Sequence, residues 1–165
     1  MGTKRVGLAR TQALIQNLKR ELTLGVGTSL AGARKKVEAI DNTAAVTLAL
    51  TEGVYPSGTV FACDFSTNGQ AVDITLPVAT AGLCYTFIAK TTNGSGTSTI
   101  TLSAPSAIMQ GVLVCDDGTE DGVGTDMVFN HSKFIAGTII EFICDGTKWN
   151  VRGTCLCDLA DVAVS

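Results

Sequence analysis

The stretch TIIEFICDGTKWNV, residues 138 to 151, reads as a β-hairpin and holds the chain's single Trp. Asp145-Gly146 separates two strand-like runs, and Asp-Gly favours a tight hairpin turn because Gly accepts the positive φ that the turn requires. In the first run, apolar side chains occupy both alternating sets of positions except at Glu141, which is typical of a strand covered on both faces. We expect Trp149 to be buried on the return strand. The hairpin is therefore interpreted as scaffold and not as the floor of an active site.

A period of two continues along the chain from Val37 onward. Eight strand-like runs stand out, at residues 44–50, 58–65, 71–77, 83–91, 98–104, 111–117, 138–145 and 148–153. Turn signals separate them, at Pro56-Ser57-Gly58, Asn68-Gly69, Asn93-Gly94, Asp117-Gly118 and Asp145-Gly146. Many short strands without intervening helices predict an antiparallel sandwich or barrel. No internal repeat of fixed period is visible.

The composition suits a small β-rich protein that shares surface with neighbours. The chain has 165 residues, enough for one folded domain, and only 16% of them are charged. Charge is divided unevenly: residues 1–36 carry eight basic groups and one acid, whereas residues 37–165 carry four basic groups and fourteen acids. A basic arm on an acidic body suggests that the arm meets nucleic acid or an acidic protein surface, and the plain alternative is a solvated tail.

The arm, residues 1–36, contains an amphipathic helix at residues 11 to 22 followed by a Gly-rich linker. Leu14, Leu18 and Leu22 recur at a spacing of four, which places them on one helical face. A helix of this length is marginal alone in water, so we expect its leucine stripe to be docked against a partner. The residues assigned to partner binding are Lys4, Arg5, Arg10, Leu14, Leu18, Lys19, Arg20, Leu22, Arg34, Lys35 and Lys36.

The residue types that carry catalysis or bind metals do not form a recognisable pattern. His131 is the only histidine, and no nucleophile elbow or phosphate-binding loop is present. Cys155 and Cys157 are closer in sequence than zinc ligands usually are. We therefore predict a protein without catalytic residues, metal or cofactor. A hydrolase that uses paired carboxylates stays open, although few aromatic side chains are available to stack a sugar.

The acidic segment of residues 115–126 is interpreted as a solvated, flexible loop. Its acids are Asp116, Asp117, Glu120, Asp121 and Asp126. Calcium favours oxygen-rich loops, but the alternate spacing of an EF-hand is absent here. The arm likewise lacks the aromatic side chains on which nucleic-acid bases would stack, so the sequence does not favour nucleic-acid binding.

The six cysteines mostly lie inside apolar runs, as small buried side chains do. The N-terminal residues are charged and do not form a secretory signal, and no apolar run has the length of a membrane span. We therefore expect all six thiols to be reduced in a protein made in a cytosol.

Three stretches carry a resemblance: SGTVFACDFSTNGQAVDITLPVATAGLCYTFIAK (57–90), GTIIEFICDGTKWNVRG (137–153) and the opening MGTKRVGLARTQALIQNLKREL (1–22). Together they look like the β-rich accessory virion proteins of tailed, marine-type bacteriophages, which include decoration, fibre and related proteins. The resemblance implies a virion component and transfers no catalytic residue.

From this resemblance we expect a basic helical arm, residues 1–36, followed by a β-sandwich domain of jelly-roll character, residues 37–165. The expected function is capsid decoration: a trimeric cement protein on the capsid surface, assembled in the host cytoplasm and bound to the major capsid protein or another virion protein. The nearest rival is a tail fibre, collar or adsorption-apparatus component that the arm anchors. A virion-associated hydrolase and a DNA-binding protein are the rivals from other classes.

Overall fold

The computed structural model describes residues 12, 35–95, 98–104, 108–158 and 162–164. The chain divides into two units, Met1–Ala33 and Arg34–Ser165, and almost all of the described residues belong to the second. The helix predicted at residues 11 to 22 lies outside the described residues except for Gln12, which is helical. That helix therefore stays a prediction.

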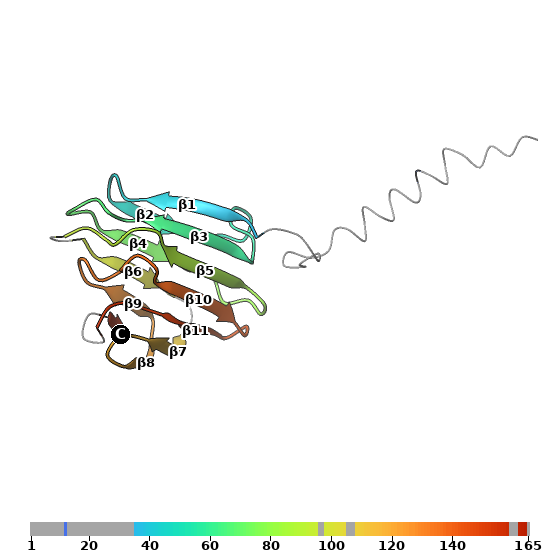
Figure 1. Cartoon of the computed structure of the whole chain (residues 1–165). Coiled ribbons are helices and arrows are strands. Elements are labelled where there is room, and N and C mark those ends of the chain that lie inside the picture. Colours follow the sequence, from blue (N-terminus) through green and yellow to red (C-terminus); the bar gives the residue numbers. More distant parts are fainter. Residues whose placement is uncertain (1–11, 13–34, 96–97, 105–107, 159–161, 165) are drawn as a thin grey trace, which may run out of the picture. The chain divides into compact units, whose positions relative to one another are not determined.

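The unit Arg34–Ser165 is mainly β, as predicted, and its strands form two sheets (Figure 1). Sheet A has the order β1 (Val37–Asp41), β3 (Thr59–Asp64), β5 (Cys84–Ala89), β10 (Ile139–Cys144), β11 (Lys148–Thr154), β7 (Ile108–Val114) and β8 (Thr119–Gly124). Sheet B has the order β12 (Val162–Val164), β9 (Asp126–Phe129), β6 (Ile100–Ser103), β4 (Val72–Thr75) and β2 (Val46–Ala49).

The first six strands wind as a flattened coil that alternates between the two sheets. In sheet A, β1, β3 and β5 pair in parallel, and in sheet B, β2, β4 and β6 do the same. Each turn of the coil takes 23 to 28 residues: Val37 pairs with Val60, and Val72 pairs with Ile100. The purely antiparallel arrangement predicted from the sequence is therefore wrong, and so is a jelly roll, which is built of antiparallel strands. Alternation of apolar residues fixes which face a strand buries, but not the direction of its neighbour.

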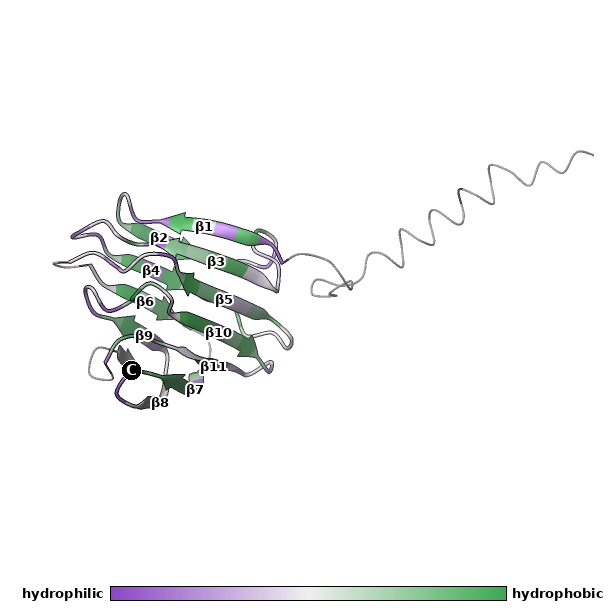
Figure 2. Ribbon diagram, in the orientation of Figure 1, coloured by the Kyte–Doolittle hydropathy of each residue, from purple (hydrophilic) through white to green (hydrophobic). Residues whose placement is uncertain are grey.

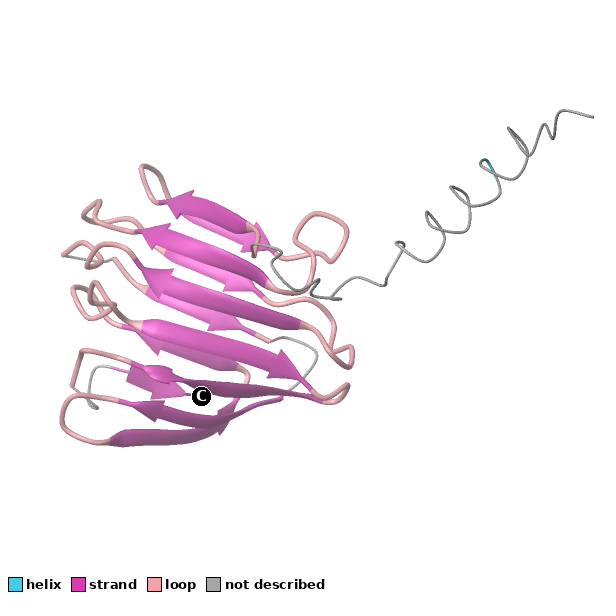
Figure 3. Cartoon of the chain, turned by 45° about the vertical axis from the view of Figure 1, so that its right-hand side comes forward, coloured by secondary structure: helices cyan, strands magenta, loops and turns pink. Residues whose placement is uncertain are grey.

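The remaining strands extend the coil mostly in the antiparallel sense. In sheet A, β10 pairs with β5 and with β11, and in sheet B, β9 pairs with β6 and with β12. One parallel pair remains, between β11 and β7, and β7 forms a hairpin with β8. At this end the two sheets meet, because the backbone of Gly122 in β8 packs against the side chain of Val164 in β12. At the other end β1 and β2 are the outer strands (Figure 3).

One core lies between the inner faces of the two sheets. It holds all six Phe side chains together with Tyr85 and Trp149: Phe61, Phe65, Phe87, Phe129, Phe134 and Phe142. Phe61 stacks on Phe87 with ring centroids 4.9 Å apart. The hydroxyl of Tyr85 donates a hydrogen bond to the carbonyl oxygen of Tyr55 over 3.0 Å, and burial raises the pKa of Tyr85 to about 12.

The hairpin of residues 138 to 151 forms as predicted, and Trp149 is fully buried on its return strand. Gly146 has φ 103°, the positive value that the turn needs. The Asp145 carboxylate accepts hydrogen bonds from the backbone N–H groups of Thr147 (2.8 Å) and Lys148 (2.7 Å) and from the Thr147 hydroxyl. These hydrogen bonds lower the pKa of Asp145 to about 2.

The acidic segment differs from the predicted loop. Thr119–Gly124 is strand β8, which pairs with β7, and β9 begins at Asp126. The sequence alone did not suggest this strand, because its Gly and acidic residues are poor strand formers. Backbone pairing with β7 stabilises this strand although its residues have a low propensity to form one.

Candidate interaction surface

The outward face of sheet A is the most unusual surface of the described residues. Strand pairing and alternation place on it every second side chain of β1, β3, β5, β10, β11 and β7. We call this set the sheet A outer face: Val37, Ala39, Asp41, Val60, Ala62, Asp64, Cys84, Thr86, Ile88, Ile139, Glu141, Ile143, Lys148, Asn150, Arg152, Thr154, Ile108, Gln110, Val112 and Val114. Ten of these twenty side chains are Val, Ile or Ala.

Several of the apolar side chains are open to solvent in the middle of the sheet. Val112 and Val114 are both 47% exposed, Ile139 is 44% exposed and Ile143 is 36% exposed. On β10, the alternate residues Ile140, Phe142 and Cys144 are buried in the core instead. The sequence predicted that both faces of this strand are covered, and within the described residues only one of them is.

The outward face of sheet B provides the comparison within the same molecule. Its side chains on β2, β4, β6 and β9 are mostly short and polar: Thr47, Ala49, Asp73, Thr75, Thr101, Ser103, Asp126 and Val128. This face has the composition expected of a sheet that faces water. The sheet A outer face has the composition of one that faces protein. Figure 2 shows β10 and β7 as apolar along most of their length.

A polar row crosses the centre of the sheet A outer face. Arg152 on β11 donates from Nε to Oε2 of Glu141 on β10 over 2.6 Å. Two residues earlier on β11, Oδ1 of Asn150 accepts a hydrogen bond from Gln110 Nε2 over 3.1 Å. Lys148 Nζ in turn donates to Gln110 Oε1 over 3.0 Å. These contacts hold the side chains across three strands, and the acid and base of the ion pair cancel in charge.

A shallow depression lies beside this row. Its volume is about 540 Å³, and it is lined by Gln110, Gly111, Ile143, Asn150, Val151 and Arg152. At Gly111, which has φ 151°, a Cβ would clash with the carbonyl oxygen of Val151 on the neighbouring strand, so only Gly fits at this position. The lining of the depression is mostly apolar and offers a partner side chain a recess.

Of the residues assigned to partner binding, the structure describes Lys35 and Lys36, and the other nine lie outside the described residues. Lys35 is exposed. Lys36 forms an ion pair with Glu38 at 2.5 Å, donates to the carbonyl of Val54 over 3.3 Å, and lies 5.7 Å from the ring centre of Tyr55. Lys36 is thus tied to the β unit by its side chain.

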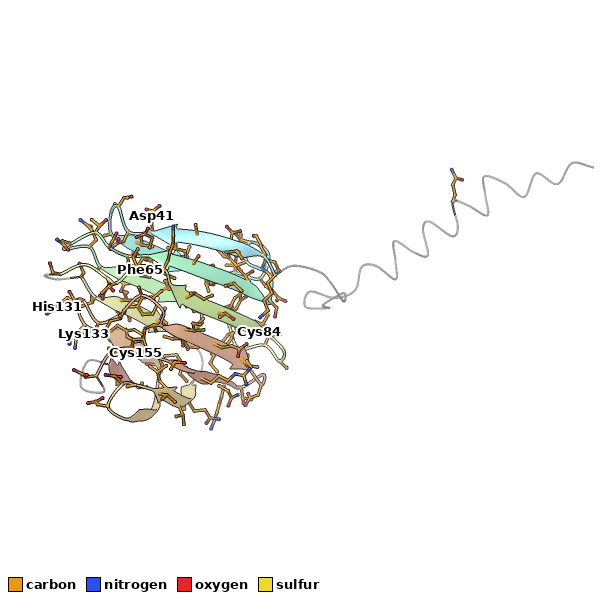
Figure 4. The ribbon with its side chains drawn as sticks, viewed as in Figure 1. Asp41, Phe65, Cys84, His131, Lys133 and Cys155 are labelled. Carbon is orange, nitrogen blue, oxygen red and sulfur yellow. A yellow bond between two sulfur atoms is a disulfide. The ribbon has the colours of Figure 1, made fainter. Side chains whose placement is uncertain are left out.

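The cysteines differ in part from the prediction of six free thiols. Cys155 and Cys157 form a disulfide in the turn after β11, whereas Cys63, Cys84, Cys115 and Cys144 are not in disulfides. The two partners have Cα atoms 5.4 Å apart, a normal separation for a disulfide. Cys155 lies against the carbonyl of Lys133, which is near it in Figure 4. The sequence argument considered the redox compartment and overlooked the local geometry of a Cys-x-Cys turn.

The other candidate groups do not come together in the structure. His131 is exposed in the turn between β9 and β10 (Figure 4). Among the described residues, no three His, Cys, Asp or Glu side chains lie close enough to hold a metal ion. No helix in the described part of the chain has the length and apolar character of a membrane span.

The apolar part of the sheet A outer face was not identified from the sequence, although a signal was present. In IMQGVLV (108–114), apolar residues occupy both alternating sets of positions, as they do in β10. Ile108, Val112 and Val114 point outward while Met109 and Leu113 are buried. Comparison of the chain with family models, with curated proteins and with solved structures gave no match.

Proposed function

We propose that the chain is a structural protein of a bacteriophage particle and that it acts as a capsid decoration, or cement, protein. The observation that supports this most is the uncovered apolar sheet A outer face. Monomeric soluble proteins rarely leave a large apolar patch open, and such patches usually mark protein–protein contacts. A protein whose main surface feature is a contact face fits a role in assembly better than a role in turnover.

In this proposal the two parts of the chain have different tasks. The β unit self-associates, and the basic arm, as a helix, attaches to the major capsid protein or another virion protein through its positive charge and its leucine stripe. A head shell under the pressure of packaged DNA gains stability from extra contacts between subunits. A small β unit with an attached arm can span a junction between capsomers.

One observation favours the rival role in a tail fibre, collar or adsorption apparatus. The three stacked turns of parallel strands are the kind of unit from which elongated solenoids are built. The location on the particle separates the two roles. Immunogold labelling of intact particles is expected to cover the head evenly. Label confined to one vertex or to the tail would support the fibre or collar role, and unlabelled particles would contradict both.

The attachment mechanism is tested on the full-length chain. In 1 M salt the Debye length falls to about 3 Å, which weakens exposed ionic contacts but not apolar burial. We expect the protein to remain on particles in high salt and Leu18→Asp to detach it. Gln16→Asp, which adds the same charge on the polar side of the predicted helix, is the control and should remain bound. Equal binding of both variants would show that the leucine stripe does not attach the protein.

A further inference from the structure

We infer that the sheet A outer face is covered by the same face of a second copy of this chain, with Glu141 and Arg152 at the centre of the contact. This inference rests on the self-association in the proposed function and names the surface that performs it. The first support is the contrast between the two sheets: sheet B presents Thr, Ser and Asp outward, while sheet A presents Val, Ile and Ala. Half of the outward side chains of sheet A are Val, Ile or Ala, against two of the eight outward side chains named for sheet B.

The charges at the centre select a copy of the chain as the occupant. Glu141 and Arg152 are one acid and one base on adjacent strands, and they are paired with each other. Arg152 still has most of its side chain exposed, at 72%, so its remaining donors are open to a partner. When a second copy faces the first, rotation about an axis between the two groups sets each Arg152 opposite the other copy's Glu141. The pair is therefore complementary to itself and needs no partner of opposite net charge.

The rest of the β unit makes this face the natural place for copies to approach. Residues 37–165 carry an excess of ten acidic groups, so copies of the β unit repel each other over most of their surface. On the sheet A outer face two bases, Lys148 and Arg152, stand against three acids, Asp41, Asp64 and Glu141, so this face is close to neutral. Burial of Ile139, Ile143 and Val112 then contributes attraction where repulsion is least.

The size of the face is sufficient for a specific contact. The six strands that carry this face, at about 4.8 Å each and about six residues long, cover roughly 29 Å by 20 Å, or about 600 Å² per copy. Two copies bury about 1,200 Å², which is the lower end of the range for specific interfaces. Packed sheets interlock through β-branched side chains, and the depression over Gly111 gives a facing side chain a place to enter.

Charge reversal in the full-length protein tests the contact directly. Glu141→Arg leaves two positive groups on each face, and Arg152→Glu leaves two negative groups. Each variant alone is expected to lose self-association, with a dissociation constant at least tenfold higher than that of the unmodified chain. A mixture of the two variants is expected to associate again, because the two faces are then complementary. Sedimentation velocity measures both states, and a fluorescent label on one variant shows that the complex is mixed.

Two controls separate contact from folding. Asp73→Arg reverses a charge on the outward face of sheet B and should leave association unchanged. Val112→Asp should weaken association, while Thr47→Asp, its counterpart on sheet B, should not, and circular dichroism checks that all variants are folded. The inference is overturned if folded single variants still self-associate or if the mixture fails to.

The same experiment separates this inference from the proposed function. If the unmodified chain is monomeric at micromolar concentration but still labels phage heads, a capsid protein covers this face. The function then stands and the inference fails. If the variants behave as expected but particles carry no label, the inference stands and the proposed function fails.

Discussion

The side chain of Asn42 pairs with the backbone of Thr67 as a neighbouring strand would. Asn42 Oδ1 accepts from the Thr67 N–H over 3.0 Å, and Asn42 Nδ2 donates back to the Thr67 carbonyl over 3.1 Å. The same amide also donates to the carbonyl of Phe65 over 3.1 Å. Asn42 is 1% exposed, so its amide, and not water, makes these hydrogen bonds to the backbone bend at Phe65 and Thr67 in the next turn of the coil.

Replacing Asn42 with Ala should destabilise the β unit, because the Thr67 N–H would lose its acceptor inside the protein and the Phe65 carbonyl would keep only the Gly94 N–H. We expect the free energy of unfolding to fall by roughly 2–3 kcal/mol, the cost of leaving such groups unsatisfied. Urea unfolding measures it. Thr43→Ala, which removes an exposed hydroxyl that bonds Asp41, is the matched control and should cost less than about 0.5 kcal/mol. Equal losses would mean that Asn42 does not link the turns.

Trp149→Ala should act through folding and not through loss of a ligand. Removing a fully buried Trp typically costs about 3–5 kcal/mol in free energy of unfolding. Trp149→Phe should cost less, since it keeps most of the ring volume and removes an indole N–H that is buried without an acceptor. Thermal unfolding of both variants checks the order. A Trp149→Ala variant that stays as stable as the unmodified chain but has lost a specific ligand would contradict the scaffold interpretation.

The disulfide makes a count of thiols informative. Protein purified without reductant and unfolded in denaturant should show four reactive thiols per chain, and six after reduction. In the folded protein, Cys84 is only partly buried and should react first with a thiol reagent. Cys63 should react slowly, because burial raises its pKa to about 12. Six thiols before reduction would show that Cys155 and Cys157 are not bonded in solution.

Asp145 should make the hairpin sensitive to acid. The hydrogen bonds from Thr147 and Lys148 lower the pKa of Asp145 to about 2 in the folded protein, from an ordinary value of 3.8. A carboxyl group with a lowered pKa in the folded state stabilises the protein above its unfolded pKa, and this contribution is lost as the pH falls from about 4 to about 2. Asp145→Asn should therefore flatten the dependence of stability on pH in this range. An unchanged slope in chemical unfolding between these pH values would contradict the assignment.

The sequence predicted where the strands lie better than which strands pair with each other. Six of the eight predicted runs contain a whole strand, the runs 111–117 and 148–153 overlap β7 and β11, and the Asp145-Gly146 hairpin and buried Trp149 are confirmed. Four strands were not among those runs: β1, β8, β9 and β12. The parallel coil was also missed, because the pairing of Val37 with Val60 depends on contacts between residues far apart in sequence, and their alternation is the same for either strand direction.

The candidate surface shows the same limit. The two-sided apolar pattern of β10 predicted a covered strand, and the pattern alone does not distinguish cover by the same chain from cover by another copy. The strand register places Arg152 between Glu141 on one neighbouring strand and Val112 on the other. Only this register shows that the three positions belong to one continuous face.

The parallel coil also determines the order in which the chain can assemble as it leaves the ribosome. Each early strand finds its neighbour one turn away, so β1 to β6 can stack while synthesis continues. β5 and β6 then wait for β10 and β9, which are made later. A nascent chain that ends near residue 104 therefore has unpaired strand edges on both sides of the coil, and such edges recruit other chains. Pauses in translation between residues 104 and 126 are expected to increase aggregation more than pauses elsewhere, since that is the interval in which the edges of β5 and β6 are both unpaired.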